Sequence, residues 1–362
     1  MSKKLNFKTD IIQHFAPGWF AAVMGTAVAV VATFVFADFI PFASVLQFFF
    51  LGVAMLLFGV IFIPWIMRWF LYPDNVRADL NHPVFGSFYP TMPISLIIVG
   101  IALEKAPPFL SEETLLPLLQ FLWFSGTAGI AWFAFTILNI NFMKDGVDLK
   151  IANMGWLIPP VSALIVPVLG GSLATAYAGT TLGTINLIAS LIFLGVGSLL
   201  FIFVMGAVFT RYISHDLLPA HLAPTIWIGI APTAILAIIT IKIVQPLMIF
   251  FKASDAAKEV FGILAKVSGV GLWGFAFLWA ILAVMVTLKH HQKIKIPFAM
   301  SWWAFTFPLG AFIVSTGVVY TAVGGKFFLW VGMTAYLAFL MIWSTVFMKT
   351  AKGVISGKIF EH

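Results

Sequence analysis

Ten apolar segments, each long enough to cross a lipid bilayer, make up most of this chain. We place them at residues 15–37, 43–70, 83–103, 114–139, 151–173, 182–210, 222–243, 259–287, 298–321 and 327–348. A hydrocarbon core of about 30 Å needs about 20 residues of helix. Backbone groups within it must be satisfied inside the protein, which favours helices. We therefore expect an all-α integral membrane protein with ten transmembrane helices in a single transmembrane domain, residues 1–362.

Composition supports this class and excludes others. The chain is 62% hydrophobic and only 9% charged over 362 residues, too apolar for the surface of a soluble domain. The first apolar segment is too long for the core of a cleavable signal peptide, so we expect it to remain. The count of zero cysteines excludes disulfides, thiolate metal sites and cysteine nucleophiles.

Five prolines recur in alternate apolar segments at nearly constant spacing. Pro17, Pro90, Pro159, Pro232 and Pro308 are separated by 73, 69, 73 and 76 residues. This period fits a helical hairpin, one proline-bearing helix followed by a second helix, repeated five times. Proline within a membrane helix frees a carbonyl and kinks the axis. The pattern predicts five inner, proline-kinked helices around a central pore, with five outer helices around them.

The net charge of +7 is explained by membrane topology and calls for no nucleic-acid partner. Of the 20 basic residues, we assign fourteen to one side of the membrane, among them Lys3, Lys4 and Arg211, and five to the other side. The smaller group is Lys105, Lys242, Lys252, Lys258 and Lys326, and Lys266 lies inside a span. The positive-inside rule then predicts cytoplasmic N- and C-termini.

Ionisable residues within the spans are few, which argues against an intramembrane enzyme, a haem protein or a metal site. Asp38, Glu104, Lys105 and Lys242 fall at predicted helix ends, and the histidines fall near helix ends or tails. We expect no cofactor and no metal. His82 is the exception to consider: it could titrate near neutrality at the inner mouth of a pore, although a histidine before a proline at a helix entry has an equally good structural explanation.

Small and hydroxylic residues cluster around the repeated prolines and are candidates for a narrow, neutral, weakly polar pore wall. Two explanations are open for each residue, pore lining or close helix packing, because small residues also let membrane helices approach. The recurring proline favours pore lining for the set. The predicted lining and kink residues are Pro17, Gly25, Thr26, Pro90, Thr91, Ser95, Pro159, Ser162, Pro232, Thr233, Thr306, Pro308 and Ser315.

A pore of this kind can prefer anions without fixed charge, since hydroxyls and unpaired N–H groups donate hydrogen bonds and helix dipoles can face the lumen. Discrimination would then follow how easily each anion sheds water. Phe305 and Phe307 flank Thr306 just before Pro308. A phenyl ring in a narrow lumen would close it by steric filling and dewetting.

Four stretches in order along the chain resemble the tellurite-resistance/dicarboxylate transporter family, which includes yeast malate and sulfite transporters and plant guard-cell slow anion channels. They are HFAPGWFAAVMGTA (14–27), NHPVFGSFYPTMPIS (81–95), WLIPPVSALIVP (156–167) and SWWAFTFPLGAF (301–312). The similarity covers nearly the whole chain. FAPGWF and His82 with Pro83 are more similar to the malate and sulfite branch than to the plant channels.

The resemblance implies a homotrimer in which each subunit has its own pore of five inner helices. It also implies a gate phenylalanine on the ninth helix, which the alignment puts at Phe307, with Phe305 the second choice. The expected cargo is a small anion: a C4-dicarboxylate such as malate, sulfite or a monovalent inorganic anion, moved across the plasma membrane. A proton-coupled carrier involving His82 is the alternative to a passive channel. A membrane enzyme or redox subunit, and a sensory protein that transports nothing, are further alternatives.

Overall fold

The structure, a computed structural model, describes residues 7–144, 146 and 148–360. Lys3 and Lys4 of the predicted cytoplasmic group therefore lie outside the described residues. Within those ranges the chain forms ten helical spans long and apolar enough to cross a membrane, and no strand. The helices are α1 (Phe20–Phe34), α2 (Ala43–Leu71), α3 (Pro73–Asn81), α4 (Thr91–Lys105), α5 (Glu112–Phe142), α6 (Ile158–Ala176), α7 (Thr181–Ser214), α8 (Ala231–Lys242), α9 (Val244–Phe250), α10 (Asp255–Lys293), α11 (Thr306–Val323) and α12 (Lys326–Ser356).

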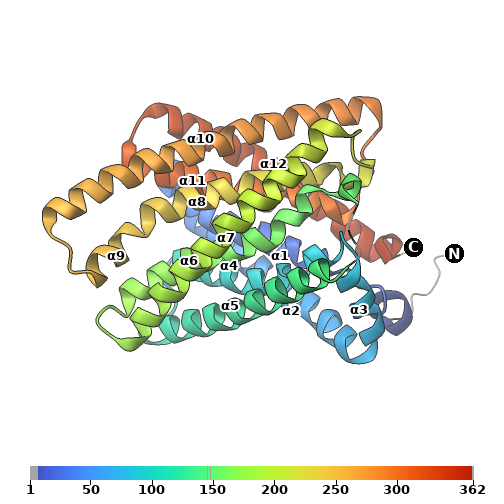
Figure 1. The fold of residues 1–362 in the computed structure, drawn as a ribbon, viewed down its shortest axis with the longest axis horizontal. Helices are drawn as coiled ribbons and strands as arrows, with labels where there is room; N and C mark the ends of the chain where they lie inside the picture. The colour runs from blue at the N-terminus through green and yellow to red at the C-terminus, as the bar shows by residue number, and fades with distance from the viewer. Residues whose placement is uncertain (1–6, 145, 147, 361–362) are drawn as a thin grey trace.

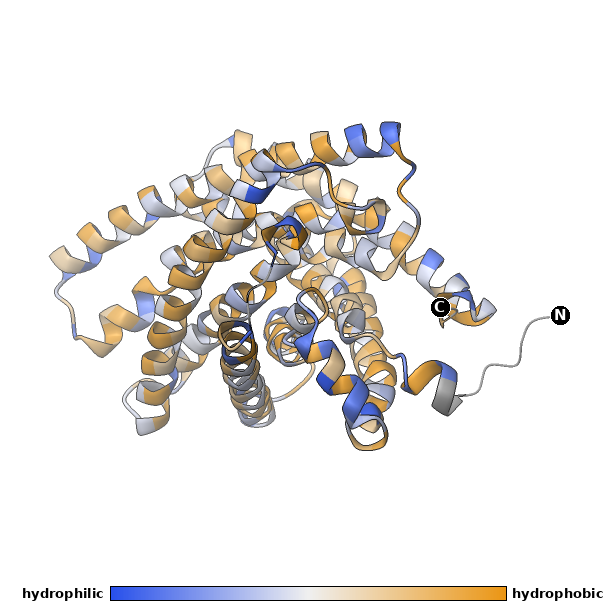
Figure 2. Cartoon of the chain, turned by 45° about the vertical axis from the view of Figure 1, so that its right-hand side comes forward, coloured by the Kyte–Doolittle hydropathy of each residue, from blue (hydrophilic) through white to orange (hydrophobic). Residues whose placement is uncertain are grey.

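Burial alternates from one span to the next. In the spans that contain α1, α4, α6, α8 and α11, between 78% and 89% of the most apolar stretch is buried, whereas the value is between 22% and 33% in those formed by α2, α5, α7, α10 and α12. We call the first set the inner helices and the second set the outer helices. Large hydrophobic side chains are exposed along the outer helices, and Figure 2 shows long stretches of hydrophobic colour on the helices. A surface of this composition fits lipid as its solvent.

The inner helices form a closed ring. α1 packs against α4, α4 against α6, α6 against α8, α8 against α11, and α11 returns to α1. Each inner helix also packs against the outer helix that follows it in the chain, α8 against α10 in the fourth case. Figure 1 shows the helices running along the long axis of the molecule, with the inner ones towards the middle. The ring gives the molecule an axis enclosed by protein.

Each repeated proline lies where an inner α-helix begins. Pro17 opens a short 3₁₀ segment (Pro17–Trp19) before α1, Pro90 directly precedes α4, and Pro159, Pro232 and Pro308 lie in the first turns of α6, α8 and α11. Proline fits this position because the first-turn N–H groups lack helical partners and its fixed φ suits the helix. We therefore revise the predicted mid-helix kinks: these prolines mark changes from 3₁₀ to α geometry.

Candidate functional site

A cavity of about 240 Å³ lies where the inner helices begin. Residues at the starts of all inner helices line it: Pro17, Thr91, Ile158, Ala231 and Pro308. We call it the start cavity. Its wall is mostly apolar, and the only ionisable side chain among its described lining residues is that of His221.

A second cavity, of about 670 Å³, lies where the same helices end. The last turns or C-terminal caps of the inner helices line it, at Val35, Lys105, Ala176, Lys242 and Thr321. We call it the end cavity. Because one cavity lies at the helix starts and the other at the helix ends, the inner helices are parallel and both cavities lie along the axis of the ring.

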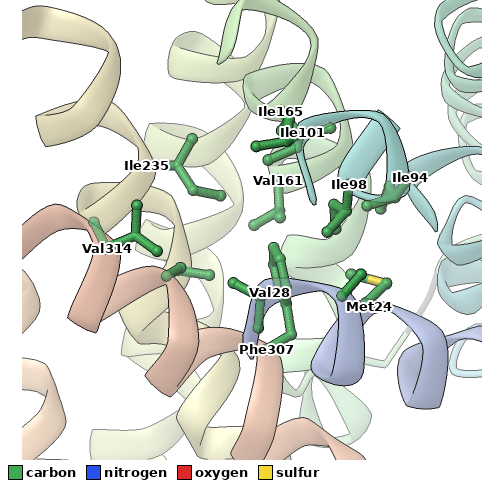
Figure 3. Close-up of a cluster of buried hydrophobic side chains, with 14 of the residues drawn as sticks. Met24, Val28, Ile94, Ile98, Ile101, Val161, Ile165, Ile235, Phe307 and Val314 are labelled. Atoms are coloured by element: carbon green, nitrogen blue, oxygen red, sulfur yellow. The ribbon is translucent and has the colours of Figure 1, made fainter. Parts of the chain in front are cut away.

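Aliphatic side chains close the axis between the cavities (Figure 3). Val28, Ile98, Ile165 and Ile235, from α1, α4, α6 and α8, line neither cavity and are at most 5% exposed. Phe307 of α11 lies against this layer. We call the four aliphatic residues, Val28, Ile98, Ile165 and Ile235, the constriction. A hydrophobic constriction excludes water and ions without any charged group.

The two phenylalanines before Pro308 have different surroundings. Phe307 lines the start cavity and is 6% exposed. Phe305 points to another region, where its ring lies 5.2 Å from Trp227 and 5.8 Å from Trp302, edge to face in both cases. It also lines a separate, peripheral cavity with Thr287 of α10. The geometry therefore separates the two gate candidates and leaves only Phe307 on the axis.

Most of the serine and threonine residues predicted to line the pore are buried between helices and do not line either cavity. Thr26, Ser95, Ser162, Thr306 and Ser315 are fully buried, and each hydroxyl donates to a carbonyl three or four residues earlier on its own chain segment. Such back-bonding satisfies a hydroxyl within a helix. None of these residues lines either cavity. At these five positions the burial and back-bonding are those expected of helix packing.

Of the remaining residues predicted to line the pore, some line a cavity and others pack between helices. Thr91 lines the start cavity and donates to the carbonyl of Pro17 at 3.0 Å, joining the beginnings of α4 and α1. Gly25 lies so close to Thr306 that an added Cβ would overlap its side chain. Thr233 is buried, and its hydroxyl has no hydrogen-bond partner among the described residues. Pro90, Pro159, Pro232 and Thr233 do not line either cavity.

His82 lies on an exposed turn beside the start cavity. Its Nδ1 accepts hydrogen bonds from the backbone N–H groups of Val84 and Phe85, both at 3.2 Å. Val84 and Phe85 line the cavity, and His82 does not. The histidine therefore holds the turn that forms part of the cavity mouth.

The end cavity contains three charged residues whose position along the axis was not predicted from the sequence. Glu104, Lys105 and Lys242 line it, although their places at helix ends suggested only interfacial positions. On α4 the residues Ile94, Ile98, Ile101 and Lys105 recur every three or four positions and so share one face. This face of α4 points towards the axis of the ring and ends in Lys105. Its spacing of three and four residues can be read from the sequence.

A ring of membrane-spanning helices with a cavity at each end of its axis is the architecture expected of a transport protein or channel. Residues 14–351 match the SLAC1 family, described as voltage-dependent anion channels. The chain belongs to this family. Membership places it among multi-pass membrane transporters and channels for anions, and not among enzymes.

Similar proteins carry transport names. An uncharacterized transporter of Methanocaldococcus jannaschii is 33% identical over 352 residues, which cover 97% of this chain and 98% of that protein. A sulfite efflux pump of Arthroderma benhamiae is 23% identical, with 97% and 93% covered. A malic acid transport protein of Schizosaccharomyces pombe is 22% identical, with 84% and 70% covered.

Proposed function

We propose that this protein conducts small anions along the axis of the inner ring, with Phe307 as the gate. The observation that carries the proposal is the position of Phe307, which lines the start cavity and lies against the aliphatic constriction. Removing its ring would take away a large part of the barrier between the cavities. A neutral gate of this kind acts by filling the lumen and keeping it dry.

Helix dipoles supply a preference for anions at the start cavity. All inner α-helices begin around it, and the N-terminal end of a helix carries partial positive charge. These dipoles act on any anion, which fits graded selectivity governed by the ease of dehydration. The start cavity therefore needs no fixed cation to favour anions.

The proposed cargo is sulfite, a C4-dicarboxylate such as malate, or a monovalent inorganic anion. The names of the sulfite and malic acid transport proteins support the first two. We further propose a homotrimer in the plasma membrane, with one pore per subunit and both termini in the cytoplasm. The last point rests on the distribution of basic residues.

The test is anion flux into liposomes that contain purified protein, under an imposed membrane potential and without a pH gradient. We expect low flux for the native chain and at least about a tenfold increase for Phe307→Ala, because loss of the ring lowers the dewetting barrier. Phe305→Ala is the matched control: the same truncation two residues away should leave flux near the native level. Equal flux from the two variants would contradict an axial gate at Phe307.

A proton-coupled carrier is the second candidate, and the position of Glu104 favours it. Glu104 lines the end cavity, so a titratable carboxyl does lie on the proposed path. Uptake that appears only when a pH gradient is added, and is lost in Glu104→Gln, would establish the carrier and refute passive conduction. Loss in His82→Asn instead would make the histidine the coupling group.

A further inference from the structure

The two cavities differ in charge. Glu104, Lys105 and Lys242 line the end cavity, together with hydrogen-bonding groups of Ser172 and Gln245. The start cavity has no Asp, Glu, Lys or Arg among its described lining residues. The side-chain charge available to a passing anion is therefore concentrated at one end of the axis.

The two lysines of the end cavity are held differently. The Nζ atom of Lys105 pairs with Glu104 Oε1 at 2.8 Å and lies 5.8 Å from the centre of the Phe34 ring. Lys242, on α8, is exposed and forms no ion pair within the described part of the chain. The pair from α4 is nearly neutral as a unit, so Lys242 supplies the net positive charge.

A cation is needed at this place if anions pass it. All inner helices end around the cavity, and helix C-termini carry partial negative charge. Those carbonyl ends alone would oppose an anion. Lys105 and Lys242 stand in the last turns of α4 and α8, where positive charge reverses the sign of the local potential.

We propose that the end cavity is an electrostatic collecting site for small anions, in which Lys242 is the attracting cation and Glu104 limits the attraction by neutralising Lys105. The inference rests on the anion-conducting function proposed above. Coulomb energy is proportional to the charge of the ion. The site therefore favours divalent anions, such as a dicarboxylate, over monovalent ones such as chloride.

The experiment uses a charge series in the Phe307→Ala background, where flux is high. Lys242→Gln lowers the cavity charge by one, Glu104→Gln raises it by one, and the double variant Glu104→Gln with Lys105→Gln leaves it unchanged. Lys266→Gln is the matched control, since it removes the same charge from a residue that does not line the end cavity. Chloride and malate fluxes are measured at about 0.05 M and about 1 M total salt, with an inert salt that the pore excludes.

We expect Lys242→Gln to lower chloride flux about threefold and malate flux about tenfold at low salt, and Glu104→Gln to raise both. The double variant should match its parent. At about 1 M salt, where screening acts within about 3 Å, the differences should shrink. An increase in flux in Glu104→Gln cannot come from misfolding.

Two outcomes would overturn the proposal. If flux responds to Lys242→Gln and Glu104→Gln no more than to Lys266→Gln, the end cavity does not collect anions, although the pore conducts. If the Phe307→Ala parent shows no flux, both the collecting site and the proposed anion pore are wrong.

Discussion

Tryptophan and threonine side chains join the inner and outer layers at the residue scale. The indole Nε1 of Trp343 on α12 donates to Thr26 on α1 at 3.0 Å, and that of Trp273 on α10 donates to Thr316 on α11 at 2.8 Å. Each threonine hydroxyl in turn donates a hydrogen bond to the backbone carbonyl four residues earlier. An indole N–H without a partner in an apolar interior is costly, so these pairs fix how the two layers face each other.

Thr26→Val tests whether this hydroxyl serves packing or the pore. The change keeps the side-chain shape and removes the acceptor for Trp343, so we expect a loss of about 1 to 2 kcal/mol of stability and unchanged anion selectivity. Thermal unfolding in detergent and relative chloride and malate flux are the two measurements. Unchanged stability together with altered selectivity would return Thr26 to the pore wall.

The roles of individual side chains, lining the pore or packing between helices, were the part of the site that the sequence predicted least well. Hydroxyls near a proline are typical of both a polar wall and a packed interface, and only contacts separate the two. Thr306 illustrates this, because it faces Gly25 of α1 and bonds to the carbonyl of Trp303. In a chain that is 62% hydrophobic, the axial row of Ile94, Ile98 and Ile101 has the same pattern as a lipid-facing stripe.

At the element scale, glycines set the closest approach between α1 and α11. A Cβ at Gly310 would overlap Val28, and one at Gly317 would overlap Val35. Both contacts lie on the side of α11 that closes the ring against α1. Small residues at such positions let membrane helices pack at short distance, where dispersion contacts are strongest.

Gly310→Ala should therefore destabilise the protein by about 1 to 3 kcal/mol through overpacking. Gly59→Ala on α2 is the control, because no atom of the described residues beyond its own stretch of helix lies within 4 Å of its added Cβ. The higher helix propensity of alanine should leave stability equal or slightly raised. Thermal unfolding of the two variants side by side checks this. A Gly310→Ala protein as stable as Gly59→Ala would show that α1 and α11 do not depend on the glycine contact.

Helix positions were predictable because long apolar runs in a membrane protein have few alternatives. The predicted segment 43–70 corresponds to α2 (Ala43–Leu71), and 298–321 corresponds to the span Met300–Val323. The start of each inner α-helix was misjudged, since proline suggested a kink where the structure has a 3₁₀ segment followed by a helix start. Sequence alone does not separate these two uses of proline.

At the scale of the whole molecule, the closed ring of inner helices encloses an axis with a cavity at each end and the aliphatic constriction between the two cavities. The order of the ring, α1, α4, α6, α8 and α11, follows the order of the chain. The fivefold spacing of prolines predicted inner helices, whereas the enclosed, aliphatic character of the axis follows only from the way the helices are rotated about their own axes.

Labelling of single cysteines shows whether the axis of the ring is closed by Phe307, because the native chain contains no cysteine that would react. Membrane-impermeant thiol reagents are applied from either side to Ala21→Cys in the start cavity, Ser172→Cys in the end cavity and Ile98→Cys in the constriction. We predict that Ala21→Cys reacts only from the cytoplasmic side, Ser172→Cys only from outside, and Ile98→Cys from neither side until Phe307→Ala is added. Reaction of Ile98→Cys with Phe307 in place, or no reaction in the Phe307→Ala protein, would contradict a pore closed by that ring.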